Sequence, residues 1–396
     1  MRLEGFLQAI YEDETFQSLR QSIKEKKFPV GIYGVSESAR AYLISALFGK
    51  EKDSLFIFAS KDMDAKNLYE DLLLYESEVY YFPAKDVVFY NIDAVSGDLR
   101  WERLKVMKAL QNNKKKIVVT TIEALASLYA PYDFFTDYHM TLTKGMEISL
   151  KDMGKKLTSA GYVRVELVEG KGEYALRGGI LDVFPPDGVL PYRVELFGDE
   201  IDSIRSFHPE NQRSIEQVES FEIFPAKELI LREEIMEKGA KAIEEEMESI
   251  LKDKTKRKGY EKEVLEKLKK HVASNVEHLR QGMFFENIDA YLPFFFEAPS
   301  TFFEFMGKGK ILIDDTAHSL GKLDSVYTEF QEDYEAFLRR GEILPSQGAL
   351  MMDKALLLET LKEKEVLTLN QFQKTERFLP PRSLISFNQM TSYNYQ

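Results

Sequence analysis

The sequence predicts an α/β protein in which two separate chain segments build one parallel sheet, with a small α+β domain inserted between them. Strand-like and helix-like patterns alternate through residues 1–137, which is typical of a parallel sheet covered by helices on both faces. Residues 138–224 carry several short strands and few long helices. A buried-strand pattern returns at 311–315, so we expect the first sheet to resume after the insertion.

The first segment, 1–137, begins with an amphipathic pattern that predicts a helix over residues 1–23. Short apolar runs rich in β-branched and aromatic residues predict its strands: 28–35, 55–60, 79–84 and 116–121. Apolar residues at helical spacing predict the helices between them: 36–50, 63–76 and 101–113.

The rest of the chain divides into three parts. The inserted domain, 138–224, has one helix-like run, 149–161, and six strand-like runs: 138–145, 162–170, 178–185, 191–199, 200–208 and 218–225. Residues 225–380 form the second part of the α/β domain, with long charged helices around the strand 311–315. Residues 381–396 are polar, and we expect a linker or a truncated tail.

Composition narrows the class of protein. The 396 residues carry a formal net charge of −13, which argues against a surface devoted to nucleic acid or membrane. There are no cysteines and only five scattered histidines, so we expect no metal site and no cofactor. No secretory signal or apolar run of membrane-spanning length is present, and a cytoplasmic protein is expected.

A loop between the first strand and its helix resembles a phosphate-binding loop without its chemistry. Gly31, Gly34 and Ser38 stand in the register of such a loop. Ser36 stands where a glycine is needed, and Glu37 replaces the lysine that binds the phosphates. Because an anion would then face a polyanion, we expect no productive nucleotide binding. The alternative is an ordinary strand–turn–helix connection that never bound a nucleotide.

A second degenerate site lies at the end of the strand 311–315. Asp314 stands where an ATPase places its magnesium-binding aspartate, and Asp315 is one methylene shorter than the glutamate that positions water. Acidic residues often end apolar strands, so this pattern alone is weak. Together with the loop, it indicates an ATPase fold that has lost hydrolysis.

The strand-like run 192–197 places charged and aromatic side chains on one face. Because strand side chains alternate, Arg193, Glu195 and Phe197 should point outward, while the even-numbered residues face the core. An exposed aromatic residue beside arginine is typical of an interface hot spot. In the alternative, Phe197 packs under the helix that follows 226, and Arg193 and Glu195 form a cross-strand salt bridge.

Several motifs resemble the N-terminal region of the Mfd family of bacterial transcription-repair coupling factors, which is similar to the excision-repair protein UvrB. The most specific motifs are YALRGGILDVFPP, LPYRVELFGDEIDSIRSF and NQRS, all within 174–214. VYYFPAKDVVFYN, LRWERLKVMKAL and KIVVTTIEALASLYAP support them, while ILIDDTAH departs from the UvrB motif at Asp315 and Thr316. UvrB itself is a poorer match, because the stretch from Tyr80 to Arg100 is too short for its DNA-clamping hairpin.

The resemblance implies a degenerate P-loop, helicase-like domain that is not an enzyme by itself. It implies that the inserted domain binds UvrA through four residues, Arg177, Arg193, Glu195 and Phe197, and that the intact protein engages RNA polymerase and duplex DNA through other domains. The chain would then be a fragment of a longer protein. Arg177 has an alternative role, an ion pair with Asp182 or Glu173.

Two other functions are compatible with parts of the sequence. One is an ATP-dependent DNA helicase or a UvrB-type damage-loading ATPase, which Glu37 argues against. The other is non-specific DNA binding through the basic segments 252–259 and 269–271, which the acidic net charge argues against.

Overall fold

The computed structural model describes residues 7–85, 89, 97–253, 261–285, 287–373 and 378–390. Its largest sheet has seven parallel strands in the order β17-β1-β16-β15-β2-β4-β3. The strands are β1 (Val30–Val35), β2 (Leu55–Ala59), β3 (Val79–Tyr81), β4 (Ile117–Thr121), β15 (Lys310–Asp314), β16 (Val366–Asn370) and β17 (Ser383–Met390). Strands from both sides of the insertion are neighbours in this one sheet, with β1 between β17 and β16 and with β15 beside β2, which confirms the predicted α/β class.

Alternation along the strands gives the sheet two buried faces. In β2, Phe56 and Phe58 enter one hydrophobic core, while Leu55 and Ile57 enter the other. The second core is completed by four helices: α1 (Gln8–Tyr11), α2 (Glu14–Lys24), α3 (Glu37–Lys50) and α4 (Asp62–Leu72). The first is completed mainly by α5 (Gly97–Gln111), α6 (Glu123–Ala126), α11 (Leu292–Phe295), α12 (Phe302–Met306), α13 (Thr316–Arg339) and α14 (Lys354–Glu363).

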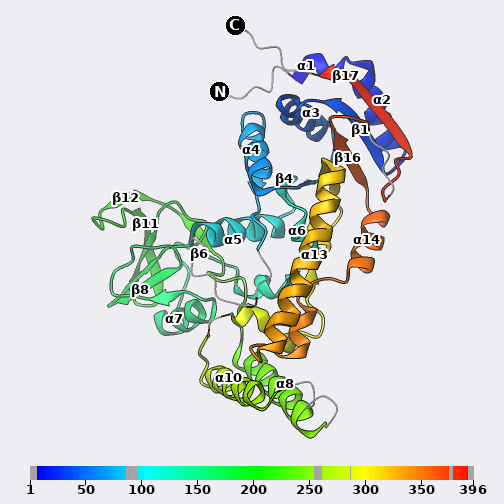
Figure 1. Cartoon of the computed structure of the whole chain (residues 1–396). Coiled ribbons are helices and arrows are strands. Elements are labelled where there is room, and N and C mark those ends of the chain that lie inside the picture. Colours follow the sequence, from blue (N-terminus) through cyan, green and yellow to red (C-terminus); the bar gives the residue numbers. More distant parts are fainter. Residues whose placement is uncertain are drawn as a thin grey trace.

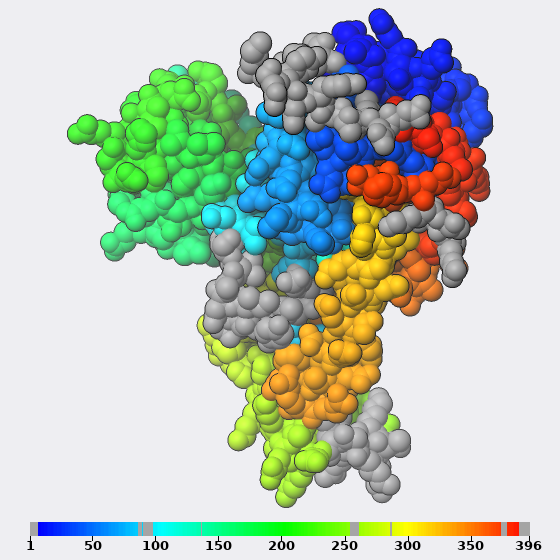
Figure 2. Space-filling model, turned by 45° about the horizontal axis from the view of Figure 1, so that its top comes forward, coloured from blue at the N-terminus to red at the C-terminus, as the bar shows by residue number. Residues whose placement is uncertain are grey.

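The inserted domain forms a separate lobe at the side of the molecule (Figures 1 and 2). Its six-stranded sheet, β12-β11-β10-β9-β8-β7, is antiparallel except for the pair β7 and β8, which is parallel. The strands are β7 (Val163–Arg164), β8 (Glu173–Arg177), β9 (Ile180–Val183), β10 (Tyr192–Phe197), β11 (Glu200–Phe207) and β12 (Ser214–Gln217). Helix α7 (Leu150–Ser159) and the pair β6 (Met140–Thr143) and β13 (Ser220–Ile223) cover one face. The expected domain boundaries remain predictions.

Two long helices project from the lower end of the molecule in Figure 1, α8 (Glu233–Lys252) and α10 (Lys262–Arg280). Their apolar stripes, at the predicted helical spacing in α8, pack into the core shared with the parallel sheet. Among the described residues, no helix is both long and apolar enough to cross a membrane.

Two sequence predictions need correction. The single helix expected over 1–23 is divided into α1 and α2, because Asp13 caps the second helix by accepting the Phe16 N–H at 2.8 Å. The tail expected from 381 contains β17, which pairs in parallel with β1. This strand lies at the sheet edge, where polar residues are tolerated, and of its described side chains those of Ile385 and Phe387 enter the core. Residues 391–396 lie outside the described part.

Candidate docking surface and the degenerate phosphate loop

The outward face of β10 carries the side chains predicted to form a docking surface. Val194, in the middle of the strand, is fully buried in the core under the sheet. Arg193, Glu195 and Phe197 alternate with the core-facing residues and lie on the other face. The described side chains therefore confirm the predicted alternation.

Strand register brings further charged residues to this face. Arg193 in β10 stands directly opposite Asp182 in β9 and Arg205 in β11. In the next row, Glu195 lies opposite Ile180, which itself lies opposite Arg177 in β8. Residues from four strands, distant in sequence, thus form one surface, here called the docking face.

A single buried carboxylate holds both arginines of the predicted set. Asp182 has no exposed surface, and its Oδ1 accepts the Nε–H of Arg193 at 2.7 Å. Its Oδ2 accepts from Nη2 of Arg193 at 2.9 Å and from Nη2 of Arg177 at 2.7 Å. The bidentate geometry fixes the Arg193 guanidinium, and the hydrogen bonds to Asp182 raise the pKa of that guanidinium. The ion pair considered for Arg177 therefore exists, with Asp182 and not with Glu173.

Glu195 has partners other than Arg193. Its carboxylate lies 3.5 Å from Arg205 and accepts the Ser203 hydroxyl at 3.0 Å. The predicted alternative, a salt bridge between Arg193 and Glu195, is wrong, because the strand register places Asp182 beside Arg193.

Phe197 ends β10 at a turn with Gly198, whose φ is +67°. Its side chain is 84% exposed, so the alternative in which it packs under the helix after 226 is also wrong. A free phenylalanine ring on a sheet face leaves a large apolar surface in water, which binding would remove.

Sequence reasoning missed two members of this face. Arg205 could have been found from the alternation of its own strand, since it follows Ser203 by two residues. Gln212 gave no signal, because it adopts a left-handed φ of 61° in a loop and reaches Arg193 only through the fold.

The loop predicted as a degenerate phosphate loop joins β1 to α3, as expected from the sequence. Gly34 has a φ of +79°, which a side chain would rarely adopt. Ser36 and Ser38 share a hydroxyl hydrogen bond of 3.1 Å, and Glu37 opens the first turn of α3. Gly31 lies inside β1, where its Cα is packed between the side chains of Tyr33 and Pro381.

The structure brings this loop and the acidic pair together through a residue that sequence reasoning missed. Arg40, one turn into α3, donates to Oδ2 of Asp314 at 2.6 Å, and both side chains are largely buried. Burial raises the pKa of Asp314 to about 6, against the opposing effect of Arg40. Asp315 turns away with a φ of 44° and pairs with His318 at 2.6 Å. A guanidinium therefore neutralises the carboxylate predicted to descend from a magnesium ligand.

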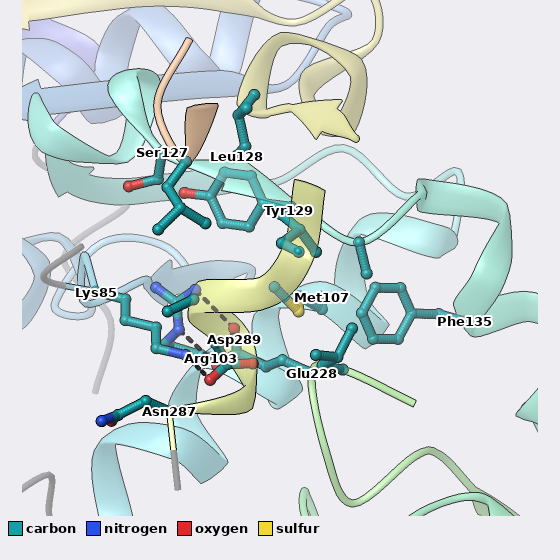
Figure 3. Close-up of a pocket in the computed structure, with 15 residues that line it drawn as sticks. Lys85, Arg103, Met107, Ser127, Leu128, Tyr129, Phe135, Glu228, Asn287 and Asp289 are labelled. Carbon is teal, nitrogen blue, oxygen red and sulfur yellow. Dashed lines mark hydrogen bonds and ion pairs between the residues drawn. The ribbon is translucent and has the colours of Figure 1, made fainter. Parts of the chain in front are cut away.

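A cavity of about 120 Å³ lies between α5 and the segment that leaves the inserted domain (Figure 3). Arg103 binds Glu228 through two hydrogen bonds of 2.6 and 2.8 Å, and Lys85 pairs with Asp289. Because the charges in its wall pair with one another, the cavity offers no net charge to a ligand. Among the described residues, no cluster of three or more metal-ligating side chains occurs.

Only part of the two basic segments considered for DNA binding falls among the described residues. Residues 254–260 lie outside the described part, as do 86–88 and 90–96 within the stretch compared with the UvrB hairpin. In the second basic segment, Lys269 pairs with Glu266 at 2.7 Å.

Comparison with known proteins shows what the inserted domain and the whole chain are similar to. Residues 140–229 match the family model described as the UvrB interaction domain. The chain is 28% identical over 392 residues to the transcription-repair-coupling factor of Bacillus subtilis (strain 168), covering 98% of this chain and 33% of that protein. It resembles the N-terminal, UvrB-like region of the transcription-repair-coupling factor.

Other relatives carry the same name. The transcription-repair-coupling factor of Staphylococcus haemolyticus (strain JCSC1435) is 29% identical over 82% of this chain, and that of Staphylococcus aureus (strain Mu50 / ATCC 700699) is 30% identical over 81%. Each alignment covers 27% of the relative. The chain thus spans a third or less of the length of the curated relatives it matches.

Of the two candidate sites, the docking face lies inside the residues matched by the family model and the degenerate loop lies outside them. All four predicted docking residues lie within 140–229, as do Asp182, Arg205 and Gln212. The degenerate loop and the Arg40–Asp314 pair lie outside it, in the parallel-sheet domain. The docking face therefore lies within the part of the molecule that the interaction-domain family covers.

Proposed function

We propose that this chain is the UvrB-like module of a transcription-repair coupling factor and recruits the nucleotide-excision-repair protein UvrA through its inserted domain. One observation carries the proposal: Phe197, 84% exposed, shares a sheet face with arginines held by a buried carboxylate. Aromatic and arginine side chains on a rigid element are the usual anchors of protein interfaces. The match of residues 140–229 to the UvrB interaction domain supports the same partner.

We also propose that the module does not hydrolyse ATP. Glu37 places a carboxylate at the position expected for the phosphate-binding lysine, and Arg40 engages Asp314 where a magnesium ion would need that oxygen. In the intact protein, other domains would supply contacts to RNA polymerase and duplex DNA. The module would then act in transcription-coupled DNA repair by binding alone.

The docking proposal is tested with the double substitution Arg193→Ala and Phe197→Ala. We expect UvrA affinity, measured by titration calorimetry, to fall at least tenfold, because a buried aromatic anchor contributes roughly 2 kcal/mol or more. Val189→Ala is the matched control, since Val189 is 90% exposed in a loop of the same domain. Unchanged affinity in the double variant would contradict the proposal.

The nucleotide proposal is tested by titrating Mg-ATP into the wild type and into Glu37→Lys. We expect no micromolar binding in either protein, because restoring the lysine leaves Arg40 paired with Asp314. Glu37→Gln controls for removing the negative charge alone. Micromolar binding by the wild type would favour the alternative, an ATP-dependent helicase or damage-loading ATPase.

A further inference from the structure

The two arginines of the docking face differ in how many of their donors the domain itself uses. Arg193 makes four hydrogen bonds: two to Asp182, one of 3.1 Å to Oε1 of Gln212 and one of 3.4 Å to the Gln212 carbonyl. A guanidinium has five N–H donors, so little of its capacity remains for a partner. Among the described residues, Arg177 makes one hydrogen bond through its side chain, to Asp182.

The two arginines also differ in how far their side chains are exposed to water. The side chain of Arg193 is 17% exposed, and its guanidinium lies over the fully buried ring of Phe207, 4.5 Å from the ring centre. The side chain of Arg177 is 48% exposed. One edge and one face of the Arg193 guanidinium are thus occupied inside the domain, whereas Arg177 is open to water.

Gln212 is built to hold Arg193 in place. Its backbone is left-handed, with φ of 61°, and its side chain reaches Arg193 on the outward face of the sheet. Its Nε2 donates to the carbonyls of Pro209 at 2.7 Å and Val168 at 3.1 Å, which leaves Oε1 directed at Arg193. The carbonyls of two loops therefore hold the Gln212 amide in place, and this amide in turn holds the Arg193 guanidinium.

The formal charges on the docking face indicate which kind of partner group it would attract. Asp182 carries one negative charge and binds two arginines, so this cluster has a net charge of +1. Arg205 and Glu195 form a neighbouring pair that is neutral as a whole. The uncompensated positive charge lies at the more exposed of the two arginines, next to an exposed aromatic ring.

We propose that Arg177 is the arginine that contacts a carboxylate of the partner, while Arg193 is a positioning residue locked by Asp182 and Gln212. This inference rests on the proposed docking function and specifies how its surface is divided. Phe197 supplies the apolar contact, Arg177 the charge complementarity, and Arg193 the rigidity that aligns them.

The test measures UvrA binding by the 396-residue chain at several salt concentrations, together with thermal unfolding. We expect Arg177→Gln to weaken binding roughly three- to tenfold, to flatten the dependence of Kd on salt, and to leave the melting temperature unchanged. Gln212→Ala should weaken binding roughly threefold while keeping the wild-type salt dependence, because it loosens Arg193 without removing a charge. Arg193→Gln should lower the melting temperature, because Asp182 loses its bidentate partner.

Several outcomes would overturn the inference. It fails if Arg177→Gln binds like the wild type, or if Gln212→Ala flattens the salt dependence as much as Arg177→Gln does. It also fails if Arg193→Gln alters binding and salt dependence without any loss of stability. A wild-type chain that does not bind UvrA would instead overturn the proposed docking function itself. If the wild type binds and Phe197→Ala does not, the docking function stands, and the three arginine and glutamine variants then decide the roles of Arg177 and Arg193.

Discussion

At the scale of single residues, the site predicted to be a vestigial nucleotide site contains a buried carboxylate that is neutralised by a cation of the same chain. Asp314 ends a fully buried strand, where an unpaired carboxylate would be costly. Arg40 supplies a cation at 2.6 Å, so the site retains its acidic residue without requiring a metal for neutrality. The pair also gives a measurable pH signature.

We expect Asp314→Asn to change how stability depends on pH. Because burial raises the folded-state pKa to about 6 from the usual 3.8, the folded protein binds the proton more tightly than the unfolded chain between these values. The contribution of Asp314 to the free energy of unfolding should therefore decline as pH rises from 4 to 6, by about 2–3 kcal/mol. Urea denaturation of both proteins at pH 4, 5, 6 and 7 checks this, and parallel curves would contradict it.

At the scale of elements, the last described strand completes the first. Strand β17 pairs with β1 from Val30 onward, with a shift of register between Tyr33 and Val35. At Gly34, which lies within that irregularity, the Phe387 carbonyl approaches so closely that a Cβ atom would lie only 2.0 Å from its oxygen. The packing of β17 against β1 is therefore sufficient to require a glycine at this position.

Gly34→Ala should destabilise the protein by about 2 kcal/mol or more, since it combines a positive φ with a backbone clash. Gly321→Ala is the matched control: Gly321 lies in helix α13 with nothing near its added methyl group, so a gain of up to about 1 kcal/mol is expected. The free energy of unfolding in urea measures both. Equal effects of the two substitutions would show that Phe387 does not constrain the loop.

At the scale of the whole molecule, helix α5 fastens the inserted domain to the parallel sheet. The Trp101 ring packs against Gly172, where a Cβ atom would lie 2.9 Å from it. Lys108 reaches Asp187 at 2.7 Å and Glu222 at 2.9 Å. Together with Arg103, which pairs with Glu228 (Figure 3), three residues of one helix contact the inserted lobe or the segment that leaves it. The docking face is therefore presented in a defined orientation.

Arg103→Met should destabilise the protein by about 3–5 kcal/mol, because Glu228 would be left charged and unpaired in a site that is mostly buried. Adding Glu228→Leu should recover most of that loss. Arg339→Met is the control, since its ion pair is exposed and 3.9 Å long, and a change within about 0.5 kcal/mol is expected. Additive effects of the Arg103 and Glu228 substitutions in urea denaturation would contradict the coupling.

Local patterns accounted for much of the fold and for part of the docking face. The strand 55–59 and the apolar stripe of α8 could be predicted because each follows from the spacing of apolar residues close together in the sequence. The outward placement of Arg193, Glu195 and Phe197 followed from alternation for the same reason. The strand β17 was not predicted, because it has the polar composition of a strand at a sheet edge and not a buried apolar pattern. Its partner strand, β1, also lies more than 350 residues away in the sequence.

The sequence by itself determined the layered α/β class, the insertion, the strand–loop–helix unit around Gly34 and the exposed aromatic strand. Only the tertiary structure decided that Arg40 would neutralise Asp314, that Asp182 would hold two arginines, and that Gln212 would lock one of them. The physical reason is the distance along the sequence over which each feature is set. Alternation and helical spacing are properties of adjacent residues, whereas the partner of a buried charge is set by strand register and by which segments the packed core brings together.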